Sequence, residues 1–123
     1  MESSEDKEKI LNLIDKYGLE KRVKIDNFTN DIKSYFMNSS VLTLSSRWEG
    51  MPMIVLESLE MGVPIISYDI TATQQLIEDK KEGLLVNKYD TIKFAEAMKI
   101  MADSQHLREE MSKNAINKST EFD

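Results

Sequence analysis

The sequence predicts an α/β fold, a Rossmann-like parallel sheet of about four strands with helices on both faces. Two observations support this prediction. Short apolar runs rich in β-branched residues, typical of buried parallel strands, occur at residues 41–44, 64–68 and 84–86, and apolar and charged residues alternate at 23–25. Helical spacing of apolar residues fills the intervals between these runs, as expected for strand–helix–strand units. We therefore expect residues 1–123 to form a single domain.

The chain is predicted to begin with an amphipathic helix from Lys7 onward, which Gly18 ends. Its apolar residues follow the i, i+3, i+4, i+7 spacing and are Ile10, Leu13, Ile14 and Tyr17. A short strand is expected at residues 22–26, where apolar and charged side chains alternate. Residues 27–30 are expected to supply the turn and the cap for a second helix through Phe36.

The central element is a strand at Val41–Leu44, a turn and a buried helix. Pro52 suits the first position of that helix, where a missing N–H is tolerated, and Gly62 suits the left-handed residue just past its end. The next strand, Pro64–Tyr68, is continuously apolar, which indicates that both of its faces are covered. Gly83 is then expected to turn the chain into a last short strand at residues 84–86.

Two helices should follow the last strand. Asp90 or Thr91 is expected to cap the first and Ser104 to cap the second. The predicted apolar face of the first helix comprises Ile92, Ala95, Met98 and Ala102, and that of the second comprises Leu107, Met111 and Ala115. The methionines of these helices are expected to fill gaps in the core, namely Met98, Met101 and Met111.

Composition limits the classes of function. The net charge of −6, with no more than two basic residues in a row, argues against nucleic acid as a partner. The absence of cysteine excludes disulfides and thiolate chemistry. Because there is no signal peptide and no apolar run of about 18 residues, we expect a cytoplasmic protein. His106 is the only histidine, so it is predicted to lie at the surface, and no metal site is expected.

Backbone amides and two carboxylates are predicted to meet at the start of the central helix. The first turn of a helix that follows a parallel strand presents N–H groups and the positive end of the helix dipole, which suits a phosphate. Glu49 lies in the turn before this helix. Glu57 lies about 7–8 Å along the helix axis and leans back toward the helix start. A diphosphate with a sugar at each end would fit this arrangement of donors and acceptors.

The spacing Glu49-x7-Glu57, within SSRWEGMPMIVLESLEMGVPIISYD, resembles the E-x7-E signature of retaining glycosyltransferases of family 4, which have the GT-B fold. The resemblance implies that Glu49 is the catalytic residue that contacts the transferred sugar and that Glu57 contacts the nucleotide ribose. It assigns the diphosphate to the amides of Met51, Met53 and Ile54.

The same resemblance extends the donor-binding set to Gly50 and to Pro52, whose ring removes one amide donor. Arg47 is a candidate for a phosphate contact, although an exposed salt bridge is an equal alternative. Asn27 stands where the family usually has a glycine and is a candidate for a contact to the base. Trp48 can stack on a base or sugar, but packing beside the helix is the more frequent role of such a residue.

The resemblance also implies what lies outside these residues. Family members have a complete N-terminal Rossmann-like domain that binds the acceptor, and an Arg and a Lys that neutralise the leaving diphosphate. Neither feature precedes the first helix here, so we expect a partial donor-binding domain that is inactive in isolation. The expected donor is a UDP-sugar or another nucleoside-diphosphate sugar, with no cofactor and no metal. Peripheral membrane association of the full-length enzyme is a further implication.

One departure keeps a second function open. The stretch Ile70–Gln75 reads ITATQQ, where the family often has two glycines and an acid, so close approach of this loop to the donor is in question. The first hypothesis is a hexosyltransferase of polysaccharide biosynthesis. The alternative is a non-catalytic binding or scaffold module that retains the fold.

The family's sheet resembles the six-stranded order 3-2-1-4-5-6, and the strands expected here would be numbers 3 to 6. The edge near Val41 would then be open, and open edges pair readily with other chains. Either the strand at 22–26 moves in beside Val41 and forms a four-stranded sheet, or the edges pair between two copies in a homodimer.

Overall fold

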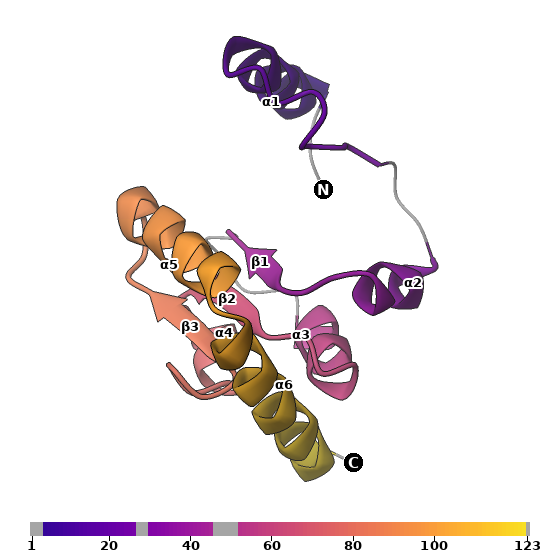
Figure 1. Cartoon of the computed structure of the whole chain (residues 1–123), viewed down its shortest axis with the longest axis vertical. Coiled ribbons are helices and arrows are strands. Elements are labelled where there is room, and N and C mark those ends of the chain that lie inside the picture. The colour runs from indigo at the N-terminus through magenta and orange to yellow at the C-terminus, as the bar shows by residue number, and fades with distance from the viewer. Residues whose placement is uncertain (1–3, 27–29, 46–51, 123) are drawn as a thin grey trace. The chain divides into compact units, whose positions relative to one another are not determined.

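The computed structural model describes residues 4–26, 30–45 and 52–122 of the chain (Figure 1). The chain divides into two units, Met1–Asn30 and Asp31–Asp123, which are described separately. No helix among the described residues is long and apolar enough to cross a membrane.

The first unit contains helix α1 (Ser4–Lys16), as predicted. Gly18 has a φ of +63°, and the N–H of Leu19 donates to the carbonyl oxygen of Ile14 at 2.9 Å. A left-handed glycine followed by such a bond is a common helix terminus, because it satisfies a carbonyl that has no partner inside the helix. The glycine therefore ends α1 where the sequence indicated.

The predicted strand at residues 22–26 is wrong. The N–H groups of Arg22 and Val23 both donate to the carbonyl oxygen of Leu19 at 2.9 Å, so the chain makes a further turn and then runs irregularly to Asp26. A strand is stable only when it pairs with another strand, and the described part of this unit contains no other. The repair in which this segment joins the sheet beside Val41 is therefore not seen.

The second unit is built on a parallel sheet of three strands in the order β1-β2-β3. The strands are β1 (Leu42–Leu44), β2 (Ile65–Tyr68) and β3 (Gly83–Val86). The register pairs Leu42 with Ile65 and Ile65 with Gly83. All four residues of β2 are buried, which confirms that both faces of this strand are covered. The described sheet thus has three strands rather than about four.

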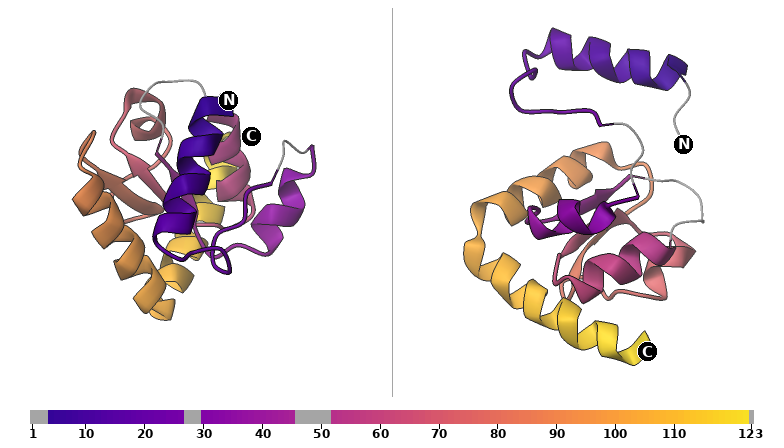
Figure 2. Two further views of the ribbon diagram at one scale, coloured as in Figure 1. Left: turned by 90° about the horizontal axis from the view of Figure 1, so that it is seen from above. Right: turned by 90° about the vertical axis from the view of Figure 1, so that its right-hand side faces the viewer.

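Helices cover both faces of this sheet (Figure 2). The helices of the unit are α2 (Ile32–Met37), α3 (Pro52–Glu60), α4 (Thr71–Gln74), α5 (Thr91–Asp103) and α6 (Gln105–Ser119), with a 3₁₀ turn η1 (Thr120–Phe122). On one face, Ile66 and Tyr68 of β2 pack with Phe94 and Met101 of α5. On the other face, Ile65 of β2 packs with residues of α3 and α6, namely Val55, Leu59 and Ala115. Because successive side chains of a strand point to opposite faces, β2 contributes residues to both cores.

Short polar side chains cap three helices of this unit. Asp90 caps α5 by accepting a hydrogen bond from the N–H of Lys93 at 3.0 Å, and Ser104 caps α6 by accepting one from Leu107 at 3.1 Å. Both caps were predicted. The cap of α2 is instead Asp31, one residue after the stretch expected to supply it, and its carboxylate accepts from the N–H and the hydroxyl of Ser34.

Helix α5 buries a different face from the predicted one. Its buried residues are Phe94, Ala97 and Met101, whereas Ile92 is 74% exposed and Met98 is 48% exposed. The periodicity allowed either face, and Phe94 is the larger side chain, so the face that carries its ring lies against the sheet. Met101 and Met111 fill the core as expected, but the prediction for Met98 is wrong.

Gly83 is the first residue of β3 rather than a turn residue before it. A Cβ atom at this position would lie 1.8 Å from the carbonyl oxygen of Ile65. No side chain fits at that separation, so the close approach of β3 to β2 requires glycine.

Candidate functional site

The candidate site lies at the carboxyl edge of the sheet, where α3 follows β1. Helix α3 begins at Pro52, as predicted, and its first turn presents amides without helical partners. Met53 in this turn is 65% exposed, whereas Ile54 is partly buried against the core of α3 and α6. The amides of Met53 and Ile54 are therefore carried by a helix start that is packed on one side and open on the other.

Glu57 lies on the second turn of α3 and is partly buried. Its carboxylate makes no hydrogen bond or ion pair with any residue that the structure describes. A partly buried carboxylate without a protein partner retains its full capacity to accept hydrogen bonds from a ligand. Glu60, one turn further along the same helix, is exposed.

The far end of α3 is firmly anchored. The hydroxyl of Ser58 donates to the carbonyl oxygen of Val63 at 2.7 Å, and the N–H of Val63 donates back to the carbonyl oxygen of Ser58 at 2.9 Å. Gly62 has a φ of +70°, as predicted, and a Cβ there would lie 2.9 Å from the hydroxyl oxygen of Ser112 on α6. The helix that carries Glu57 is thus fixed in position from its carboxyl end.

Several predicted site residues lie outside the described part of the chain. They are Asn27, Arg47, Glu49, Gly50 and Met51, together with Trp48. Their roles therefore stay predictions. Of the two predicted carboxylates, the structure describes only Glu57.

The stretch Ile70–Gln75, which departs from the family pattern, contains the short helix α4. The hydroxyl of Thr73 donates to the carbonyl oxygens of Tyr68 and Ile70 at 3.0 and 3.1 Å, and Thr73 is buried. Ala72 packs against the core beneath α5. Ala72, which replaces one of the expected glycines, and its neighbour Thr73 thus hold this segment on the sheet, whereas Thr71 is exposed.

A third segment at the carboxyl edge is the turn Asn87–Asp90, which follows β3. The N–H of Asp90 donates to the carbonyl oxygen of Asn87 at 3.1 Å and closes the turn. Tyr89 occupies its third position with a φ of +68° and is 60% exposed. The sequence does not point to Tyr89, because a positive φ leaves no signal in the residue type when the residue is not glycine.

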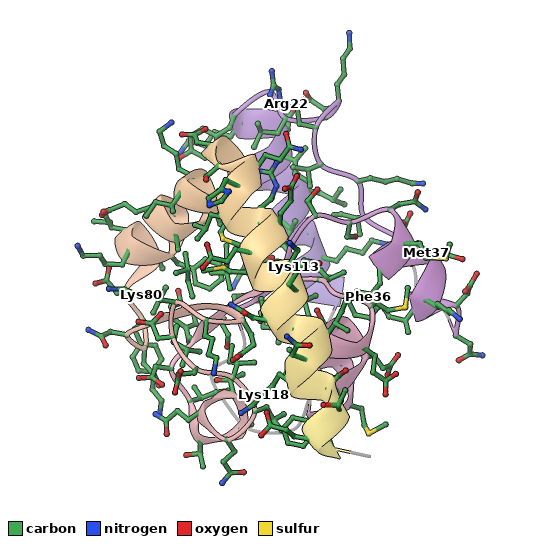
Figure 3. The ribbon with its side chains drawn as sticks, turned by 60° about the horizontal axis from the view of Figure 1, so that its bottom comes forward. Arg22, Phe36, Met37, Lys80, Lys113 and Lys118 are labelled. Atoms are coloured by element: carbon green, nitrogen blue, oxygen red, sulfur yellow. The ribbon has the colours of Figure 1, made fainter. Side chains whose placement is uncertain are left out.

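A hollow of about 520 Å³ lies elsewhere, at the amino ends of the strands. Its lining includes Ser39 and Ser40 before β1, Pro64 before β2, and Arg108 and Lys113 of α6. Lys113 is labelled on α6 in Figure 3. The hollow is shallow, and it lies at the opposite end of the sheet from the start of α3. It therefore does not belong to the candidate site.

A metal centre is not formed by the described residues. No group of three or more His, Asp or Glu side chains among them is placed to hold an ion. The side chain of His106 is 91% exposed, which confirms its predicted surface position. Its Nε2 lies 3.8 Å from a carboxylate oxygen of Glu110 on the same helix.

Comparison with known proteins identifies curated relatives that are named as glycosyltransferases. A UDP-Gal:alpha-D-GlcNAc-diphosphoundecaprenol alpha-1,3-galactosyltransferase from Escherichia coli is 35% identical over 101 residues, which cover 82% of this chain and 26% of that protein. The chain spans between 26% and 33% of the length of the first curated relatives that it matches.

Solved structures share the fold. Anabaena Alr3699/HepE in complex with UDP has a TM-score of 0.88 at 18% identity, covering 96% of this chain and 33% of that one. The C-terminal domain of a glycosyl transferase group 1 family protein (LpcC) from Francisella tularensis has a TM-score of 0.82 at 20% identity, covering 94% of this chain and 60% of that one. These likenesses confirm the GT-B type of fold. Because the model of the family described as glycosyl transferases group 1 matches residues 3–118, the chain belongs to that family.

Proposed function

We propose that this chain is the donor-binding part of a retaining glycosyltransferase that transfers a hexosyl group from a nucleoside-diphosphate sugar. The observation that carries the proposal is the carboxylate of Glu57, which is partly buried on α3, faces no partner among the described residues and lies one turn from the exposed helix start. Hydroxyl groups of a ribose are suitable donors for such an acceptor.

In this proposal the diphosphate binds at the amino end of α3. The amides of Met51, Met53 and Ile54 donate to its oxygens, and the positive end of the helix dipole stabilises its charge. Pro52 supplies no N–H, so its neighbours provide the donors. These amides take the place of a metal ion in holding the diphosphate, and no cofactor is needed.

Glu49 is proposed to contact the transferred sugar, and Gly50 lets the backbone approach the donor closely. The segment that carries both residues joins β1 to α3, so the sugar lies beside the diphosphate. Arg47 is proposed as a further phosphate contact. Asn27 is proposed as a contact to the base.

The names of related proteins guide the proposal for the substrates. The Escherichia coli relative is named for a UDP-galactose donor and a lipid-linked acceptor, and the Anabaena structure contains UDP. We therefore propose a UDP-sugar donor, a glycan or lipid-linked acceptor and a role in polysaccharide biosynthesis. An N-terminal Rossmann-like domain is proposed to bind the acceptor.

The experiment that tests the site compares two substitutions on one helix. Glu57→Gln should weaken UDP binding by about 1–3 kcal/mol, or roughly 5- to 150-fold, because it removes charge-assisted hydrogen bonds to the ribose. Glu60→Gln changes the same net charge at an exposed position one turn away and should leave UDP binding unchanged. Isothermal titration calorimetry with UDP measures both. Equal losses in the two variants would mean that only net charge matters and would contradict the role of Glu57.

A third variant separates the two carboxylates. Glu49→Gln should leave binding of free UDP intact and weaken binding of UDP-glucose or UDP-galactose, because only the sugar is proposed to reach Glu49. If Glu49→Gln and Glu57→Gln weakened UDP binding to the same extent, the separate roles for sugar and ribose would be wrong.

A further inference from the structure

The outer edge of β3 is covered by the chain itself. In the sheet order β1-β2-β3, β3 is an edge strand (Figure 1). The carbonyl oxygen of Glu82 accepts a hydrogen bond from the N–H of Ile65 on β2 at 3.2 Å. The backbone groups of alternate residues of a strand face the same side, so those of Leu84 also face β2, and those of Gly83 and Leu85 point away from the sheet.

A loop that precedes β3 bonds to both of these outward residues. We call residues 78–82 the clasp. The N–H of Lys80 donates to the carbonyl oxygen of Gly83 at 2.7 Å, and a carboxylate oxygen of Asp79 accepts from the N–H of Leu85 at 2.9 Å. Asp79 and Gly83 also form an isolated parallel β-bridge. The clasp thus takes the hydrogen-bonding groups that an edge strand otherwise offers to another chain.

The clasp is anchored from within and from α6. Glu82 is 1% exposed, and its Oε1 accepts a hydrogen bond from the N–H of Glu78 at 2.8 Å. Asn114 of α6 donates a side-chain N–H to the carbonyl oxygen of Lys81 at 2.9 Å. Together these two contacts hold the loop against the edge of the sheet.

Two features oppose the closed form of the clasp. Lys80 has a φ of +70°, a left-handed angle that is costly for a residue with a Cβ atom. Oε2 of Glu82 is buried without a hydrogen-bond partner among the described residues, and an unpaired buried acceptor disfavours the folded form. Opening the clasp would relieve the strain and let this oxygen reach water. Closure is therefore a balance of opposing terms that a single substitution can shift.

The groups under the clasp are also those that a second copy would use. When two β3 strands lie antiparallel about a two-fold axis, the N–H of Leu85 in one copy faces the carbonyl oxygen of Gly83 in the other. These are the same two groups to which the clasp bonds. The clasp and a second copy therefore compete for one edge.

We propose that the clasp is a conformational device that keeps β3 from pairing with the β3 strand of a second copy of this chain. It is independent of the proposed function, because it precedes β3 and shares no residue with the donor site. The outer edge of β1 has no such cover, since no described residue bonds to the N–H of Thr43. A closed clasp thus leaves one open edge, which supports a dimer, whereas an open clasp leaves two, which support longer assemblies.

The test uses the Thr43→Pro chain, in which the edge of β1 is blocked and which should be a monomer. Adding Asp79→Ala removes the acceptor for Leu85 and should produce a dimer whose population rises with concentration in light scattering. Adding Glu78→Ala instead removes the same charge from an exposed neighbour whose side chain makes no hydrogen bond or ion pair with the described residues. This control should remain a monomer.

Amide hydrogen exchange, measured by NMR at concentrations where the chain is monomeric, reports on the clasp directly. Asp79→Ala should speed exchange at Leu85 roughly tenfold, as expected for the loss of one hydrogen bond, and should leave Leu84 unchanged because its N–H faces β2. Asp79→Asn keeps an acceptor oxygen and should have a smaller effect. Lys80→Gly, made in the unaltered chain, relieves the strained angle and should slow exchange at Leu85.

Dimers of the Asp79→Ala chain should protect the Leu85 amide again, because Gly83 of the second copy replaces Asp79 as its acceptor. A monomer at all concentrations, or a dimer in which Leu85 stays unprotected, overturns the proposal. Equal association of the Glu78→Ala chain also overturns it, since loss of charge would then be the cause. If Asp79→Ala prevents folding, Lys80→Gly decides the question, because exchange at Leu85 that is not slowed contradicts a strained clasp.

Discussion

Replacing Gly83 with alanine should break the contact between β2 and β3. The new Cβ would lie 1.8 Å from the carbonyl oxygen of Ile65, and 2.7 and 2.8 Å from the carbonyl carbon and the nitrogen of the same residue. These atoms belong to the backbone of the central strand, so no side-chain rotation can relieve the overlap.

The structure allows the size of the effect to be worked out. Close contacts between carbon and oxygen on adjacent strands are about 3.3–3.6 Å, so β3 would have to move about 1.5 Å away from β2. Such a shift would break about three hydrogen bonds between the strands, at about 1 kcal/mol each, and would disturb the packing of Val86 in the core. We expect a loss of about 4–6 kcal/mol, which is comparable to the whole stability of a small domain.

Gly62→Ala provides the control in the same unit. Its Cβ would meet Ser112 Oγ at 2.9 Å and Ile116 Cδ1 at 3.0 Å, which are the ends of side chains that can move. The left-handed φ of +70° would add strain, so we expect a loss of about 1–3 kcal/mol. Urea unfolding followed by circular dichroism measures both variants. A Gly83→Ala variant as stable as Gly62→Ala would refute the assigned steric cause.

Two further predictions concern the chain as a whole. The 123-residue chain should release no sugar from UDP-glucose or UDP-galactose above the rate in buffer, because neither the acceptor domain nor the basic pair of the family is present in these residues; release well above that rate would contradict the proposal. The chain should also form dimers as its concentration rises, through the open edge of β1 beside an apolar hollow of about 420 Å³. Leu42 donates its N–H toward β2, so the N–H of Thr43 points to the open edge, and Thr43→Pro should abolish the dimer without disturbing β2. Light scattering that shows a monomer at all concentrations would rule out edge pairing.

Most elements could be predicted from local sequence signals. Pro52 and Gly62 bound α3, Gly18 ends α1, and Asp90 and Ser104 cap the last two long helices. Each signal acts within a few residues, through a missing N–H, a permitted φ or a side-chain oxygen. The continuous apolar run of β2 likewise indicated a strand that is covered on both faces.

The errors occur where distant segments decide the outcome. Apolar and charged side chains alternate along residues 22–26, as they do in many strands, but the described part of this unit contains no other strand to pair with. Helix α5 has apolar residues on two faces, and only packing on β2 selects the face with Phe94. A similar limit applies to the site, because the spacing of Glu49 and Glu57 suggested a pair of ligand contacts but could not show that Glu57 has no partner among the described residues.

The sequence by itself determined the places of the long helices and of the three strands in the sheet, and which helix start faces the carboxyl edge. The tertiary structure alone decided that Gly83 must touch the backbone of Ile65 and that α5 buries the face that carries Phe94. Caps and turns depend on atoms a few bonds apart, so residue type reveals them. Strand separation and burial depend on segments brought together from far along the chain, and no local pattern of residues records that distance.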